Sequence, residues 1–232
     1  MTGAMSRLAL ILGVVTAAAL ATPIAALAGY GQPSPPPSSG PPPADKSVNA
    51  NGNAFTGGLG FDPRRVTVKV GQSVRWTNTD NLVPHTATED HRLWRLAGDY
   101  GPPGTMGFGP GESVQRRFAA GTWSYFCEIH PDQMHGVVAV PVTLGSAAAR
   151  RPGSFLVNAV WSKTALPAGQ VFDVQERIGA RAWKTVRNGV RGRQGSFAGR
   201  GGQLLSFRAR VRRTTAPTAS SSYSPVARLR LG

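Results

Sequence analysis

The stretch that decides the fold is Tyr125-Phe126-Cys127-Glu128-Ile129-His130-Pro131-Asp132-Gln133-Met134-His135-Gly136-Val137-Val138. Polar and apolar residues alternate before Cys127, and β-branched residues follow Gly136, so the pattern predicts two strands joined by a short loop. The loop carries a thiol, two imidazoles and a thioether. Cys127 is the single cysteine of the chain, so it cannot form an internal disulfide. It is an inert buried thiol, a thiol that pairs between two chains, or a thiolate bound to a metal.

A second imidazole has to come from another segment if the loop binds a metal. Val83-Pro84-His85-Thr86, which follows a predicted strand at 73–78, supplies one. Two imidazoles and a thiolate in a trigonal set, with a long axial thioether, are typical of blue copper, in which the soft sulfur ligands hold Cu(I). The sequence therefore predicts one copper ion that changes between Cu(I) and Cu(II), bound by His85, Cys127 and His130, with Met134 as the weak fourth ligand.

Other ligand sets remain open at this point. Zinc also binds cysteine together with two histidines, and either Asp132 or His135 is available as the fourth strong ligand that zinc would need. Met106, in a loop rich in glycine, is an alternative to Met134. His91 and His135 are expected to lie at the surface.

The rest of the chain favours an all-β fold. Glycine (29) and proline (19) are abundant and charged residues make up only 16%, which suits short strands and many turns. Strand-like runs are separated by turn residues in both halves, which predicts two successive β-sandwiches. These runs are 66–70, 73–78, 83–88, 114–118, 122–127 and 136–142 in the first half, and 155–161, 171–177, 182–187, 204–211 and 226–231 in the second.

The first half resembles the plastocyanin and amicyanin branch of the cupredoxins over roughly residues 48–143, about two-fifths of the chain. The residues that carry the resemblance are Phe61-x-Pro63-x-x-Val66-x-Val68-x-x-Gly71-x-x-Val74-x-Trp76-x-Asn78-x-Asp80, then Pro84-His85-Thr86, then Gly121-x-x-x-Tyr125-x-Cys127-x-x-His130-Pro131. The resemblance implies a Greek-key β-sandwich with one blue (type 1) copper.

The same resemblance assigns roles to the candidate ligands. His85 is the upstream imidazole, Cys127 the thiolate, and His130 the second imidazole, near the surface where partners approach. Met134 is the axial ligand, although three residues separate it from His130, which departs from the family's usual spacing. Asn78 and Thr86 are expected to brace the segment that carries His85.

The second half resembles a fibronectin type III domain, an immunoglobulin-like sandwich. The resemblance rests on the segment Val157 to Trp161, the Phe207-Arg208-Ala209-Arg210-Val211 strand, and Tyr223-Ser224-Pro225 before the final strand. Leu205 stands where such domains usually carry a tyrosine.

These patterns divide the chain into five parts. Residues 1–28 are a predicted signal peptide, because Arg7 precedes an apolar run and Ala26-Leu27-Ala28 forms a cleavage site; a membrane anchor is the alternative. A proline-rich linker follows at 29–47, and the copper domain occupies 48–145. A second linker at 146–153 leads to a basic β domain at 154–232. The chain is therefore expected to be exported, to the extracellular space or the cell envelope.

The two halves differ sharply in charge. Residues 44–145 hold nine Lys/Arg and nine Asp/Glu, a net charge of zero, whereas residues 146–232 hold sixteen Lys/Arg and two acids, a net charge of +14. Arg208, Arg210 and Arg212 fall on one face of a predicted strand, and Arg187, Arg191 and Arg193 flank a glycine-rich turn. This surface is either simply solvated or attaches to an anionic envelope polymer or membrane surface. Nucleic acid is not expected as a partner of an exported chain.

The expected function is outer-sphere electron transfer with a redox partner that the sequence does not identify. An enzyme is not expected, because only two histidines remain for a second copper centre once His85 and His130 are used. Copper storage or delivery is one alternative. A surface-attachment protein whose metal serves only stability is the other.

Overall fold

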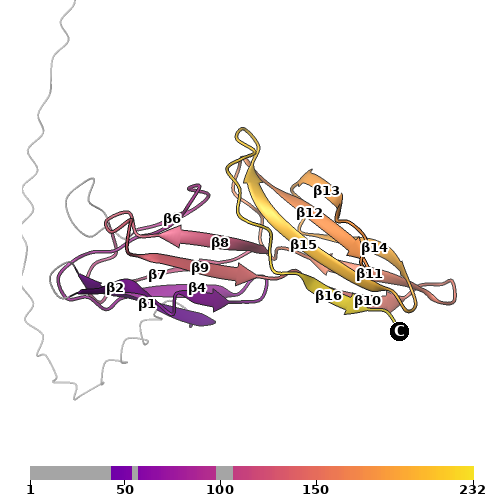
Figure 1. The fold of residues 1–232 in the computed structure, drawn as a ribbon, viewed down its shortest axis with the longest axis horizontal. Coiled ribbons are helices and arrows are strands. Elements are labelled where there is room, and N and C mark those ends of the chain that lie inside the picture. Colours follow the sequence, from indigo (N-terminus) through magenta and orange to yellow (C-terminus); the bar gives the residue numbers. More distant parts are fainter. Residues whose placement is uncertain (1–42, 54–56, 98–106) are drawn as a thin grey trace, which may run out of the picture. The chain divides into compact units, whose positions relative to one another are not determined.

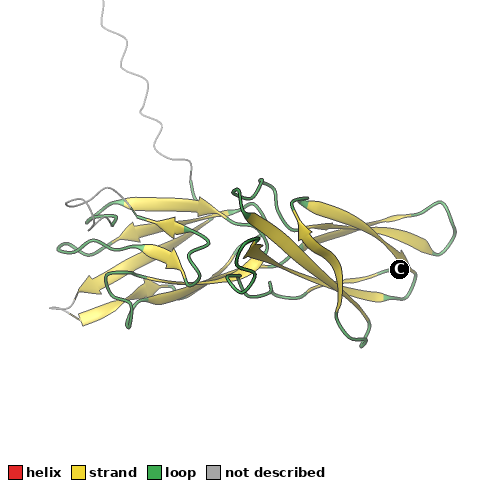
Figure 2. Ribbon diagram, turned by 90° about the horizontal axis from the view of Figure 1, so that it is seen from above, coloured by secondary structure: helices red, strands yellow, loops and turns green. Residues whose placement is uncertain are grey.

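The computed structural model describes residues 43–53, 57–97 and 107–232. These residues form sixteen strands and no helix, which confirms the prediction of an all-β fold (Figures 1 and 2). Accordingly, no helix in the described part of the chain has the length and hydropathy needed to span a membrane. The predicted signal peptide at 1–28, most of the linker at 29–47, and Met106 lie outside the described residues.

Two sheets build the first sandwich. One has the order β2-β1-β4-β7 and the other the order β3-β9-β8-β5-β6 (Figure 1). The first sheet contains β1 (Lys46–Asn53), β2 (Gly57–Asp62), β4 (Ser73–Asn78) and β7 (Ser113–Arg117). The second contains β3 (Arg65–Thr67), β5 (Ala87–Glu89), β6 (Arg95–Leu96), β8 (Gly121–Phe126) and β9 (His135–Val140).

Aromatic rings fill the space between these sheets. Trp76 is fully buried on β4 and meets Tyr125 of β8 edge-on, with ring centroids 5.4 Å apart. Phe61 packs against the same tyrosine at 4.9 Å. Gly136, at the start of β9, leaves room for this ring, since a Cβ there would lie 2.3 Å from the Tyr125 hydroxyl oxygen. The core therefore fixes both strands that hold the loop 127–134.

The second sandwich has seven strands in two sheets, ordered β10-β11-β14 and β13-β12-β15-β16. Its strands are β10 (Thr143–Ala148), β11 (Ser154–Val160), β12 (Gln170–Ile178), β13 (Lys184–Val190), β14 (Gln194–Arg200), β15 (Leu204–Arg213) and β16 (Ala227–Arg230). Trp161, Phe172 and Phe207 form its buried core. The second β domain is thus present, and its likeness to fibronectin type III stays a prediction.

The predicted linker at 146–153 is wrong over its first three residues. Ser146 to Ala148 complete β10, which pairs with β11 along its whole length, and only residues 149–153 form a turn. The second sandwich consequently begins at Thr143, inside the range 48–145 that was predicted for the copper domain. The small residues of this edge strand are nearly all exposed, so it lacks the alternation by which a strand is recognised.

Hydrogen bonds connect the two sandwiches directly. Thr122 of β8 exchanges two backbone bonds with Ser222, at 3.0 and 3.1 Å. Gln170 donates through Nε2 to the carbonyl oxygen of Leu93 at 2.8 Å. Arg213 donates to the carbonyl oxygen of Arg92 at 2.6 Å. The turn between β5 and β6 is therefore held by side chains from the second sandwich.

Candidate metal centre

The loop between β8 and β9 places three of the predicted ligands. Cys127 follows the last residue of β8, and its N–H donates to the carbonyl oxygen of Met134 at 3.0 Å, which closes the loop. Inside the loop, the N–H groups of His130 and Met134 donate to the carbonyl oxygens of Cys127 and His130, at 3.2 and 3.1 Å. Because its backbone bonds are made internally, the loop has a defined shape without any added ligand.

The remaining predicted ligand, His85, lies on a separate segment ahead of β5. His85 pairs with Phe108 by two backbone hydrogen bonds of 2.8 and 3.1 Å. Gly107 makes this approach possible, because a Cβ at that position would lie 2.6 Å from the His85 carbonyl oxygen. The pairing holds His85 over the loop 127–134.

These segments bring a thiol and two imidazoles into one cluster. The Cys127 Sγ lies 3.9 Å from Nδ1 of His85 and 3.7 Å from Nδ1 of His130. One donor atom from each residue lies within 4.8 Å of the others, and the described residues hold no other such cluster. His85 and Cys127 are fully buried and His130 is half-buried. The cluster is therefore closed on one side and reaches the surface through His130.

Thr86 links the two segments at the sulfur. Its N–H donates to the Cys127 Sγ at 3.3 Å, and its hydroxyl oxygen accepts the N–H of Glu128 at 2.8 Å. This hydrogen bond fixes the Cys127 sulfur against the residue that follows His85. This contact confirms the expectation that Thr86 braces the site.

Asn78 braces the same site from β4. Its side-chain NH₂ donates to the carbonyl oxygens of Val83 and Phe108, at 2.8 and 2.9 Å, and its Oδ1 accepts the N–H of Asp80 at 2.8 Å. Val83 precedes His85 by two residues and Phe108 is its partner. One buried amide therefore ties both sides of the His85 segment together, as the sequence led us to expect.

Asp80 is a site residue that the sequence analysis missed. Its Oδ2 lies 3.8 Å from Nε2 of the buried His85, too far for a hydrogen bond but on the opposite side of the ring from Cys127. A carboxylate there favours the tautomer with hydrogen on Nε2 and leaves the lone pair of Nδ1 facing the sulfur. Its place five residues before a candidate ligand histidine was the available signal.

Burial controls the protonation of both imidazoles. It lowers the pKa of His85 to about 4, with a further lowering from His130 and an opposing contribution from Asp80. Burial also lowers the pKa of His130. Both rings are therefore neutral at neutral pH, the state that a metal ligand requires.

The remaining candidates lie around the cluster rather than in it. Met134 is fully buried in the loop, and its role as the fourth ligand remains a prediction. His91 and His135 are exposed, as expected. Asp132 is exposed too, so neither residue considered as the fourth strong ligand for zinc joins the cluster. A thiol, two neutral imidazoles and no fourth strong donor in the cluster fit copper better than zinc.

The first sandwich has two sheets, and one of its loops places a cysteine and a histidine beside a histidine from a second segment. This combination defines the cupredoxin class. The family model of the copper binding proteins, plastocyanin/azurin family, matches residues 48–141. The plastocyanin of Scenedesmus fuscus is 35% identical over 98 residues, which cover 38% of this chain and 92% of that protein. The chain therefore belongs to the plastocyanin/azurin family through its first sandwich, and copper is its cofactor.

Further similar proteins include the chloroplastic plastocyanin of Tetradesmus obliquus, 35% identical over 94 residues that cover 36% of this chain and 59% of that protein. Among solved structures, a purple cupredoxin from Nitrosopumilus maritimus is 29% identical, covers 41% of this chain and 99% of that chain, and has a TM-score of 0.32. A Cu(I) amicyanin variant is 25% identical, covers 40% of this chain and 79% of that chain, and has a TM-score of 0.29.

Proposed function

We propose that this chain is an exported electron carrier in which one copper ion is bound by Nδ1 of His85, Sγ of Cys127 and Nδ1 of His130, with Met134 as the weak fourth ligand. The observation that carries the proposal is the cluster itself, three donor atoms within 4.8 Å of one another, supplied by two segments. Copper supplies one-electron redox chemistry when bound, by alternating between Cu(II) and Cu(I).

The residues around the cluster support electron transfer because they limit its movement. The bonds of Asn78 to both neighbours of His85, and of Thr86 to the sulfur, hold the donors at the spacing already described. A site that barely changes between oxidation states needs little reorganisation for an electron to enter or leave. Substrate chemistry would need an open ligand position, so we propose no enzymatic role.

The half-buried His130 is the proposed route for the electron. Ile129, beside it, is 40% exposed, and Leu82, on the segment ahead of His85, is 56% exposed. They are two of the three large apolar side chains that are exposed among the described residues. Exposed apolar side chains near a redox-active group suit brief contact with a partner protein.

The deciding measurement is the visible absorption spectrum of the protein after addition of Cu(II), before and after ascorbate. An intense thiolate-to-copper band that bleaches on reduction and returns on oxidation is expected. Cys127→Ser should abolish the band, whereas the matched exposed-histidine variant His91→Ala should keep it. If copper binds without this band, or cannot be cycled reversibly, the result would favour copper storage or a structural role over electron transfer.

Met134 is tested separately by Met134→Leu, which removes the thioether and keeps an apolar side chain of similar size. The band should persist and the reduction potential should rise, because a weak axial sulfur stabilises Cu(II). An unchanged potential would show that Met134 only packs in the loop.

A further inference from the structure

Most arginines of the second sandwich are occupied by neighbouring groups. Arg208 lies over the ring of Trp183 at 4.3 Å and over Tyr223 at 4.4 Å. Arg210 also lies over Tyr223, at 4.9 Å, and Asp173 forms ion pairs with both Arg210 and Arg212, at 3.2 and 3.0 Å. The strand of arginines that the sequence suggested as an attachment surface is therefore already neutralised or stacked within the fold.

The arginines around the glycine-rich turn are also engaged. Arg191 donates to the carbonyl oxygens of Gln170 and Leu166, and Arg193 donates to that of Lys163. Arg187 lies over the ring of Phe197. A ligand would have to break these contacts to bind the three arginines, so the positive charge that is available to a ligand lies elsewhere.

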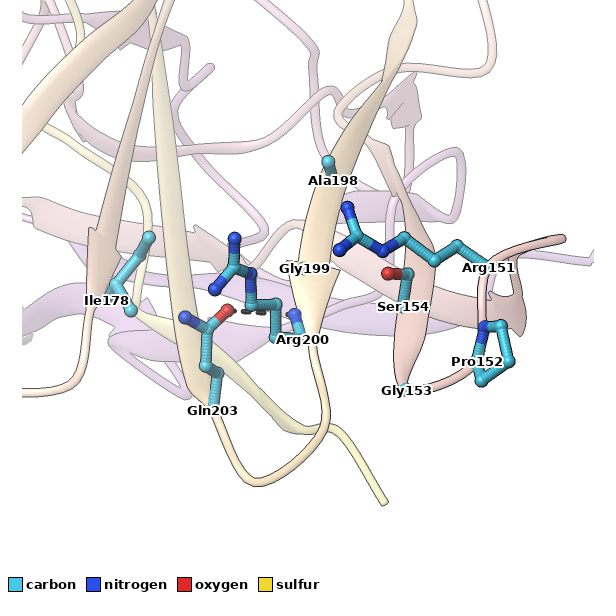
Figure 3. A pocket seen from close by; sticks show the side chains of 9 residues that line it. All are labelled: Arg151, Pro152, Gly153, Ser154, Ile178, Ala198, Gly199, Arg200 and Gln203. Atoms are coloured by element: carbon cyan, nitrogen blue, oxygen red, sulfur yellow. Dashed lines mark hydrogen bonds between the residues drawn. The ribbon is translucent and has the colours of Figure 1, made fainter.

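Available arginines gather at the turns that close one end of this sandwich. A pocket of about 520 Å³ lies there (Figure 3). The side chains of Arg151 and Arg200 line it together with Ser154 and Gln203, and the two guanidinium groups lie on either side of the β14 ribbon in this view. Both arginines are exposed, and neither side chain has a hydrogen bond or ion pair within the described residues.

A second pocket, of about 990 Å³, adjoins the first and shares Ile178 and Gln203 with it. Arg177, Arg181 and Arg230 line it. The side chain of Arg181 is exposed and has no partner within the described residues. The two adjoining pockets are thus lined by five arginines. Two of them have partners, since Arg177 lies over the ring of Trp183 at 4.7 Å and Arg230 donates to the carbonyl oxygen of Gly202. The other three, Arg151, Arg181 and Arg200, are available to a ligand.

No acidic side chain lines either pocket. The two acids of residues 146–232 are Asp173 and Glu176. Asp173 is bound to arginines of β15, and burial raises the pKa of Glu176. The charge of the five arginines is therefore not balanced inside the domain, and mobile ions or a ligand must balance it.

We propose that these two pockets form a binding site for a linear polyanion that carries repeated phosphate or carboxylate groups. A single small anion would occupy only part of two joined hollows, whereas a chain with repeated charges can contact guanidinium groups in both. The planar guanidinium forms paired hydrogen bonds with phosphate and carboxylate alike. The site lies on the second sandwich and does not depend on the copper centre.

The lining residues favour such a chain over single-stranded nucleic acid. Single-stranded nucleic acid is bound largely by stacking bases on aromatic rings, and neither pocket is lined by an aromatic residue.

The test uses the whole copper-loaded protein and measures binding of inorganic polyphosphate and of poly-glutamate at several salt concentrations. The variant Arg151→Gln/Arg181→Gln/Arg200→Gln removes three exposed charges from the pockets. The matched control Arg64→Gln/Arg65→Gln/Lys69→Gln removes three exposed charges from the first sandwich. The copper absorption band and the melting temperature of each variant show that it is folded.

We expect the pocket variant to bind at least about tenfold more weakly at roughly 0.15 M salt and to lose about two to three units from the slope of log Kd against log salt. The control should change binding by less than about twofold. The relative affinities of the two polymers distinguish a phosphate from a carboxylate chain. Equal losses in both variants would overturn the proposal, as would binding to phosphatidylglycerol vesicles with no binding to either polymer.

Discussion

At the scale of single residues, buried polar side chains organise the copper site. Asn78 is fully enclosed, and its three side-chain bonds go to backbone groups of Val83, Phe108 and Asp80. In the interior such bonds have no water to replace them, so losing one partner leaves another group unsatisfied. The order of the His85 segment should therefore depend on this one amide.

Replacing Asn78 by alanine tests this dependence. Asn78→Ala leaves the carbonyl oxygen of Val83 and the N–H of Asp80 without this partner, and removes one of the two bonds to the carbonyl oxygen of Phe108. We therefore expect it to lower the free energy of unfolding by about 2–4 kcal/mol. Denaturant unfolding of the copper-free protein gives the value. Thr77→Ala, which removes an exposed bond to Ser113 on the same strand, is the control and should cost under about 1 kcal/mol. Equal losses for the two variants would contradict the role of Asn78.

The residue scale also shows what the sequence could predict of the site. Cysteine and histidine are rare here and chemically distinctive, so the spacing of Cys127 and His130 indicated ligands directly. The roles of Asn78 and Thr86 followed from resemblance. Asp80 was missed because its effect depends on the side of the His85 ring that it faces, which only the folded segment determines.

At the scale of elements, prediction succeeded where large apolar side chains alternate with polar ones along a strand. β8 shows this alternation from Gly121 to Phe126, and its predicted range agrees closely with the structure. Five strands lie outside the predicted runs: β1, β2 and β6 in the first sandwich, and β10 and β14 (Gln194–Arg200) in the second. Glycine, serine and alanine make up most of β10 and β14, so neither sequence alternates large apolar with polar side chains, although burial does alternate along β14. Such strands are defined by pairing with β11, which no local pattern shows.

The outer face of β15 shows how an element can be stabilised by stacked rather than buried groups. Trp183 lies between two guanidinium groups, 4.7 Å from Arg177 and 4.3 Å from Arg208. Arg208 in turn contacts Tyr223. The resulting stack joins β12, β15 and the segments before β13 and β16, and cation–π contacts of this kind contribute about 0.5–2 kcal/mol each.

Two variants of Trp183 distinguish the contribution of the aromatic ring to stability from that of apolar packing. Trp183→Phe keeps a π face for both arginines, whereas Trp183→Leu keeps apolar bulk without one. We expect the phenylalanine variant to be more stable than the leucine variant by about 0.5–1.5 kcal/mol, measured by denaturant unfolding. Equal stabilities would show that Trp183 acts by bulk alone and that the stack does not stabilise the domain.

At the scale of the whole molecule, the bonds between the sandwiches reach the copper loop. Arg213 and Gln170 of the second sandwich bind the carbonyl oxygens of Arg92 and Leu93. Arg92 forms an ion pair with Glu128, the residue after Cys127. A chain of direct contacts therefore runs from β12 and β15 to the ligand loop, so stabilisation of the first sandwich by copper should extend to the second.

Copper binding gives a quantitative test of this connection. A ligand that binds only the folded state stabilises it by about 2.7 kcal/mol at 100 times its Kd. Hydrogen exchange should therefore slow on copper loading in β12 and β15 as well as in the first sandwich. The double variant Gln170→Ala/Arg213→Ala should reduce the protection of β12 and β15, whereas Gln194→Ala/Arg228→Ala, a matched pair of exposed side chains, should not. Protection limited to the first sandwich in the unaltered protein would mean that the two sandwiches unfold independently, and that their shared hydrogen bonds open without affecting the copper site.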